Sequence, residues 1–95
     1  MNANLRQAAN GHLILSLEDL PHSEWANICE YLVGTFHFER TGKEIMHVAE
    51  GIYQSFSLPQ YSLQAGWDDW NGNYLLSESD SGDECLKDVF GHFFK

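Results

Sequence analysis

The stretch that decides the expected fold is GWDDWNGNY, residues 66–74. Asn71-Gly72 within it is a strong hairpin signal, because both residues accept the positive φ angles that a type I′ turn requires. A two-residue turn at this point would pair Trp67 with Leu76 on antiparallel strands. The stretch therefore predicts a tight β-hairpin.

Strand signals continue on both sides of this turn. Tyr61, Leu63, Ala65 and Trp67 occupy alternate positions, which predicts a strand with one buried face. The returning strand is expected over residues 74–77. With Trp67 on the buried face, the predicted register leaves a second set of side chains facing solvent. That set is Asp68, Trp70, Asn73 and Leu75.

Earlier segments predict a strand, a helix and a second strand. Residues 12–17 alternate, which places their three leucines on one face. A helix is expected to begin near Pro21, since proline suits a first turn where its missing N–H would be unpaired anyway. Gly34 is expected to end that helix. A short strand is then predicted over residues 35–40.

Residues 42–57 are ambiguous. Their apolar residues recur at helical spacing, and Thr41 with Glu44 fits the capping box of a helix start. Thr41 and Gly42 are also compatible with a hairpin turn, and Gly51 weakens a helix interior by about 1 kcal/mol. We favour the helix for this segment.

The C-terminal segment predicts a last helix. Ser81 and Glu84 fit a second capping box, and apolar residues follow at helical spacing up to Phe93. The expected order is therefore β-α-β-α-β-β-α. This order predicts a small α+β fold, with a single-layer, mostly antiparallel sheet and helices packed on one face.

The length of 95 residues suits one compact core and is too short for two ordinary domains. Residues 1–11 are polar and show no periodicity, which predicts a loose N-terminal arm. Residues 12–95 are then expected to form a single α+β domain.

The charge balance narrows the class of partner. Fourteen acidic residues against five basic ones give a formal net charge of −9. Such an excess repels nucleic acid and anionic lipid, and it favours fast association with a basic partner. We expect a basic protein partner, with no nucleic acid and no membrane. Neither a hydrophobic leader nor a long apolar run is visible, so a cytoplasmic protein is expected.

Catalytic and metal-binding patterns are weak throughout the sequence. Asp68 and Asp69 are adjacent on a predicted strand, so their side chains point to opposite faces and do not share a pocket. An EF-hand-like pattern runs from Asp69 to Asp80, but Tyr74 stands where the sharp turn requires glycine. We expect no catalytic residue, no metal and no cofactor.

Cys29 and Cys85 form no CxxC pair and lie in predicted helices. In a chain without a leader we expect them to be free, buried thiols and not a disulfide. The acidic neighbours of Cys85 argue against a reactive thiolate, because negative charges raise the pKa of a thiol.

An exposed tryptophan beside carboxylates is typical of a binding hot spot. The alternative is that another element covers this face of the hairpin and that Trp70 belongs to the core. The acidic start of the last helix is a second candidate, although carboxylates there are also stabilised by the helix dipole. The candidate interaction residues are Asp68, Trp70, Asn73, Leu75, Asp80, Asp83 and Glu84.

These features predict a small acidic protein-binding module and not an enzyme. The most plausible role is an inhibitor or immunity-type protein that occludes a basic partner surface, such as that of a nuclease toxin. In general character the chain resembles small acidic immunity or antitoxin proteins of bacteria. The alternatives are a nucleic-acid mimic that blocks a DNA- or RNA-handling complex, and a small subunit of a larger assembly.

Overall fold

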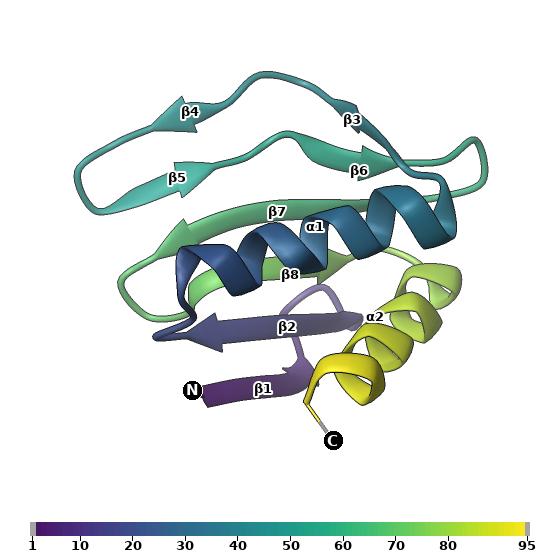
Figure 1. Ribbon diagram of the computed structural model, residues 1–95, viewed down its shortest axis with the longest axis horizontal. Helices are drawn as coiled ribbons and strands as arrows, with labels where there is room; N and C mark the ends of the chain where they lie inside the picture. The colour runs from purple at the N-terminus through teal and green to yellow at the C-terminus, as the bar shows by residue number, and fades with distance from the viewer. Residues whose placement is uncertain (1, 95) are drawn as a thin grey trace.

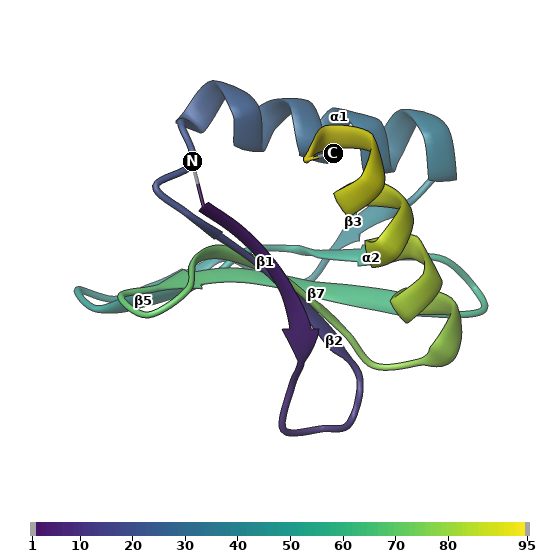
Figure 2. The same cartoon turned by 90° about the horizontal axis from the view of Figure 1, so that it is seen from below.

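The computed structural model describes residues 2–94, which form one antiparallel sheet with two helices on the same face (Figures 1 and 2). The helices are α1 (His22–Phe36) and α2 (Asp80–Phe93). The strands are β1 (Asn2–Gln7), β2 (Leu13–Glu18), β3 (Glu39–Thr41), β4 (Ile45–Met46), β5 (Glu50–Ile52), β6 (Ser55–Ser57), β7 (Ser62–Asp68) and β8 (Gly72–Ser77).

The strand order across the sheet is β1-β2-β8-β7-β5-β4, and β6 and β3 continue the sheet beside β7. The fold is therefore α+β with an antiparallel sheet, as expected. The predicted order of elements is wrong, because α1 is followed by six strands and not by a strand and a second helix.

The apolar core lies between the sheet and the two helices. The leucines of β2 face this core as predicted, and Leu15 and Leu17 are fully buried. The sheet and the helices both contribute to the cluster, since each buries its apolar side against the other. The buried members are Leu15, Leu17, Trp25, Ile28, Leu32, Phe38, Phe56, Leu63, Ala65, Leu75, Cys85, Leu86 and Val89.

Helix α1 extends past its predicted end. It begins directly after Pro21 but passes Gly34 and ends at Phe36. His37 then adopts the left-handed conformation, with a φ of 65°, and ends the helix. The ring of Phe36 packs edge-on against that of Tyr31, with centroids 5.7 Å apart, which supports the extra residues.

The prediction of a helix over residues 42–57 is wrong. This segment supplies β4, β5 and β6, of which β4 and β5 form a hairpin and β5 and β6 pair with β7. Phe56 faces the core opposite Leu63, whereas Ile45 and Ile52 pair on the face without helices. Pairing with β7 outweighs the local helical spacing, since strand propensity depends strongly on neighbouring strands.

The N-terminal residues, expected as a loose arm, form the edge strand β1. Its pairs with β2 run from Asn2 opposite Glu18 to Gln7 opposite Leu13. Ala3 and Leu5 pack against the core, so this polar segment carries a short alternating pattern that is sufficient for an edge strand.

The β7–β8 hairpin lies where it was predicted, but its register differs. Trp67 pairs with Asn73 instead of Leu76, a shift of three residues, and Asp68 pairs with Gly72. An odd shift exchanges the two faces of β8. Leu75 consequently joins the core with no exposed surface, so the prediction that it faces solvent is wrong.

The turn itself explains this register. Asn71 lies outside the positive-φ region, so the type I′ turn predicted from Asn71-Gly72 does not form. Gly72 has a φ of 65°, and a Cβ atom at that position would lie 2.9 Å from the carbonyl oxygen of Leu17. Glycine is needed there for both its conformation and the close approach of β2.

Candidate interaction surface

The side chain of Asp68 organises the β7–β8 turn. Its Oδ1 accepts hydrogen bonds from the backbone N–H groups of Trp70 at 2.9 Å and Asn71 at 2.7 Å. Desolvation acts to raise the pKa of this carboxyl, but the hydrogen bonds from Asn71 and Trp70 prevail and lower it below its usual value. Asp68 thus fixes the turn as a carboxylate.

Trp70 projects from this turn and is 87% exposed. The prediction that it faces solvent is confirmed, but for a different reason. Trp70 lies in the loop between the paired residues Asp68 and Gly72, so strand alternation does not determine its direction. The alternative that Trp70 belongs to the core is wrong.

A polar network holds the turn against the edge of the sheet. Arg6 donates one hydrogen bond to Ser16 Oγ at 2.8 Å and another to Asn71 Oδ1 at 2.9 Å. Ser16 Oγ also donates to Asn71 Oδ1 at 2.8 Å. An open groove of about 570 Å³ lies beside this network and is lined by Ala3, Asn4, Arg6, Ser16, Glu18, Trp70 and Asn71.

Several carboxylates lie at the same end of the sheet as Trp70. Glu50 of β5 lies directly opposite Asp68 of β7, and Asp69 is exposed in the turn beside Trp70. Figure 1 shows the β4–β5 turn, the β7–β8 turn and the β2–α1 connection at the same end of the sheet. We call this region the acidic end and define it by Glu18, Asp19, Glu50, Asp68 and Asp69.

Glu50 and Asp68 stand opposite each other on neighbouring strands, which brings two carboxyl groups to one row of the sheet. Both carboxyl groups affect the pKa of the Tyr74 hydroxyl on the adjacent strand. Desolvation is the main reason that the pKa of Tyr74 is raised, and the charges of Asp68 and Glu50 add to the effect. The carboxylates therefore concentrate negative charge at the acidic end.

Asn73, predicted to lie beside Trp70, takes a different position. Its Oδ1 accepts a hydrogen bond from the hydroxyl of Tyr53 at 2.8 Å. The register places it opposite Trp67, on the face of the sheet that the helices cover. The prediction that Asp68, Trp70, Asn73 and Leu75 share one face is therefore wrong, and only Trp70 of the four is fully solvent-facing.

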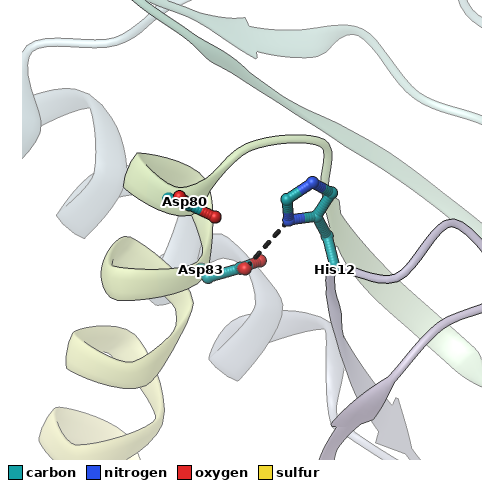
Figure 3. A group of neighbouring side chains, drawn as sticks. All are labelled: His12, Asp80 and Asp83. Carbon is teal, nitrogen blue, oxygen red and sulfur yellow. Dashed lines mark hydrogen bonds and ion pairs between the residues drawn. The ribbon is translucent and has the colours of Figure 1, made fainter.

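The acidic start of α2 lies at the other end of β8 from Trp70. Asp83 Oδ2 lies 2.9 Å from His12 Nδ1 (Figure 3). Asp83 Oδ1 accepts a hydrogen bond from the backbone N–H of Leu13 at 2.9 Å. Glu84 is exposed and pairs with Lys87 at 3.3 Å. The contacts of Asp83 fasten α2 to the start of β2.

The helix cap also differs from the predicted one. Ser79 caps α2 and accepts a hydrogen bond from the backbone N–H of Gly82 at 3.0 Å, so the helix begins before Ser81. Asp80 is exposed in the first turn of the helix, where the dipole favours an acidic residue.

His12, Asp80 and Asp83 bring ligand atoms within 4.8 Å of one another. Both oxygens of Asp83 already accept or share hydrogen bonds that join β2 to α2, and these bonds account for the arrangement. The EF-hand-like pattern from Asp69 to Asp80 is not assembled, since these residues lie beyond opposite ends of β8.

Both cysteines are free thiols in the part of the chain that the structure describes, as predicted. Cys85 is buried, and desolvation raises the pKa of its thiol to about 11. Cys29 is half-buried, so the prediction that it is buried is wrong. Its pKa is raised chiefly by desolvation, against the opposing effect of the Arg40 guanidinium. Neither environment favours a reactive thiolate.

The β4–β5 hairpin is an exposed element that was not predicted from the sequence. Val48 at its turn is completely exposed, and Ile45, Met46 and Ile52 are each about half exposed. The signal that favoured strands was present, because β-branched residues and Gly51 both weaken a helix.

Among residues 2–94, no helix combines the length and apolar character needed to cross a membrane. Comparison of the chain with protein-family models, curated proteins and solved structures finds no match.

Proposed function

We propose that this protein is a small acidic binding module that occludes a basic surface of a partner protein. In its most specific form, the proposal is an inhibitor or immunity-type protein that covers the basic active site of a nuclease toxin. The observation that carries the proposal is the position of Trp70, almost fully exposed at the acidic end.

Two physical arguments support this role. A large aromatic ring left in water gains free energy when a partner covers it, and tryptophan is among the commonest hot-spot residues. The surrounding carboxylates attract a basic surface over a distance and raise the association rate. Glu50 and Asp68, opposite each other on neighbouring strands, place two carboxyl groups where a cation from a partner could meet them.

The nucleic-acid mimic and the assembly subunit differ from this proposal in the nature of the partner. A mimic would block a protein that handles nucleic acid by filling its phosphate-binding surface. A subunit would be held permanently by a sister chain. The identity of the partner and its own activity therefore separate these roles.

The test is affinity capture from an extract of the native host, with immobilised wild-type protein and an immobilised Trp70→Ala variant in parallel. We expect a basic protein that the wild type retains and the variant loses. After purification it should form a defined complex whose association slows as salt rises, and a nuclease should lose activity in that complex.

Equal capture by the Trp70→Ala variant would contradict the proposed surface. Binding of the purified protein to DNA or RNA at physiological salt, measured by fluorescence anisotropy, would contradict the proposed class of partner.

A further inference from the structure

The β4–β5 hairpin exposes more apolar surface than the fold requires. Ile45 and Ile52 face each other across the two strands and are 47% and 50% exposed. Val48, in the turn between the strands, is 100% exposed. Met46 lies on the opposite face, where its sulfur accepts a hydrogen bond from Trp67 Nε1 at 3.3 Å. This contact joins the hairpin to β7.

The apolar surface is continuous with the acidic end. Ile52 pairs with Gly66 of β7, which in turn pairs with Tyr74 of β8. The Tyr74 ring lies close over Gly66, within 2.8 Å of where a Cβ atom would stand, and so extends the stripe begun by Ile45 and Ile52. The next row of the sheet carries Glu50 and Asp68.

We infer that the β4–β5 hairpin docks an amphipathic basic segment of the partner protein, an inference that rests on the proposed function. Apolar side chains of that segment would cover Ile45, Val48 and Ile52. Its lysine or arginine side chains would meet Glu50 and Asp68. The hairpin would thus recognise a segment of the partner whose apolar side chains are bordered by cations, and charge alone would not be sufficient.

Charge selects this occupant over two others. A second copy of the chain would bring a second Glu50–Asp68 pair against the first, and each copy carries a net charge of −9. An anionic membrane would be repelled by the same charge. An amphipathic basic segment satisfies both the apolar stripe and the carboxylate row.

The experiment titrates the ¹⁵N-labelled protein with two synthetic peptides of equal positive charge. One carries leucine and arginine at helical spacing, and in the other every leucine is replaced by serine. We expect the leucine peptide to bind at least about fivefold more tightly, with shifts concentrated at residues 45–52, 68 and 74.

Two matched variants test the contact. Val48→Ser should weaken binding of the leucine peptide by about threefold or more, because the substitution removes apolar contact at a fully exposed position. Val33→Ser, at an exposed valine of α1, should leave the affinity unchanged. Thermal melts of both variants should match the wild type, so that loss of binding is not loss of folding.

Equal binding of the two peptides, with no effect of Val48→Ser, would overturn this inference while leaving a charge-driven partner surface intact. Failure of both peptides to bind at physiological salt would contradict the inference, whereas the proposed function is tested separately by the affinity capture with Trp70→Ala. Self-association measured by light scattering, or binding to vesicles of anionic lipid that Val48→Ser abolishes, would assign the hairpin to a different occupant.

Discussion

The three tryptophans occupy three different environments. Trp25 is buried between α1 and the sheet, with its ring centroid 5.5 Å from that of Tyr53. Trp67 is half-buried, and its Nε1 donates to Met46. Trp70 is almost entirely in water. Burial, and not residue type, therefore decides which of them contributes to folding and which is available for binding.

At the residue scale, we predict opposite effects of alanine at two of these positions. Trp70→Ala should change the free energy of unfolding by about 0.5 kcal/mol or less, because the side chain makes few contacts in the folded state. Trp25→Ala should lower it by about 3–5 kcal/mol through loss of burial and a residual cavity. Urea denaturation of both variants measures the difference. A large destabilisation by Trp70→Ala would show that its ring is packed in solution.

The sequence predicted the exposure of Trp70, but from a strand register that does not form, and it did not predict the position of Trp70 in the turn. The dipeptide Asn71-Gly72 indicated a two-residue turn. In the structure, Asp68 instead accepts hydrogen bonds from the backbone N–H groups of Trp70 and Asn71. The side chain of Asn71 also accepts hydrogen bonds from Arg6 and Ser16. Arg6 is far away in sequence, and no local pattern signals that it will hold the turn.

At the element scale, the same turn depends on Gly72. Gly72→Ala should lower the free energy of unfolding by about 1–3 kcal/mol, because alanine is strained at positive φ and its Cβ would press against β2. Gly34→Ala is the matched control. A Cβ atom at Gly34 meets no neighbouring atom, so alanine should stabilise α1 by up to about 1 kcal/mol.

Thermal or chemical unfolding of these two variants checks the account of the turn. Equal effects of the two substitutions would contradict the role given to Gly72, because of the two glycines only Gly72 has a positive φ and a close backbone neighbour.

The contact between α2 and β2 predicts a pH dependence. Desolvation acts to raise the pKa of Asp83, but hydrogen bonds from His12 and Leu13 prevail and hold it below its ordinary value of 3.8. A carboxyl with a lowered folded-state pKa stabilises the fold fully above its unfolded pKa, and this stabilisation is lost as pH falls through the folded one.

Stability of the wild type should therefore decline from about pH 5 downward, and Asp83→Asn should make that decline shallower. It should not abolish it, because the lowered pKa of Asp68 remains. Guanidinium titrations at several pH values measure the slope. An unchanged slope in Asp83→Asn would remove this contact from the account of acid stability.

Elements with an apolar pattern in their own sequence could be predicted, and elements that depend on pairing with distant strands could not. The strand β2, the start of α1 and the body of α2 carry their apolar patterns in their own sequence. The segment of β4, β5 and β6 imitates a helix, and only its pairing with β7 makes it a sheet. The register of β7 and β8 likewise depends on the turn, in which Asp68 accepts hydrogen bonds and Gly72 lies close to β2.

At the scale of the whole molecule, the net charge is −9, and carboxylates gather at both ends of the sheet. The acidic end combines its carboxylates with exposed apolar side chains. The region around the start of α2, with Glu78, Asp80, Asp83 and Glu84, instead uses Asp83 to hold the fold together. The sequence predicted the β7–β8 hairpin and the start of α2 as candidate regions, and the side chains of the two regions make different contacts.

Any acidic surface of the protein contributes to long-range attraction of a basic partner. Short-range contacts contribute to the affinity only at the surface that touches the partner. The two ends of β8 are separated by roughly 15–20 Å, which exceeds the Debye length of about 8 Å at physiological ionic strength. Charge changes at the two ends should therefore have separable effects on affinity.

The most direct test compares Asp69→Lys with Glu78→Lys, two exposed charge reversals at opposite ends of β8. The measurement is the affinity of each variant for the captured basic partner at physiological salt. We expect Asp69→Lys to weaken binding at least about tenfold and Glu78→Lys to change it by less than about threefold. Equal losses would mean that net charge alone drives binding. A larger loss for Glu78→Lys would move the binding surface to the start of α2 and contradict the account.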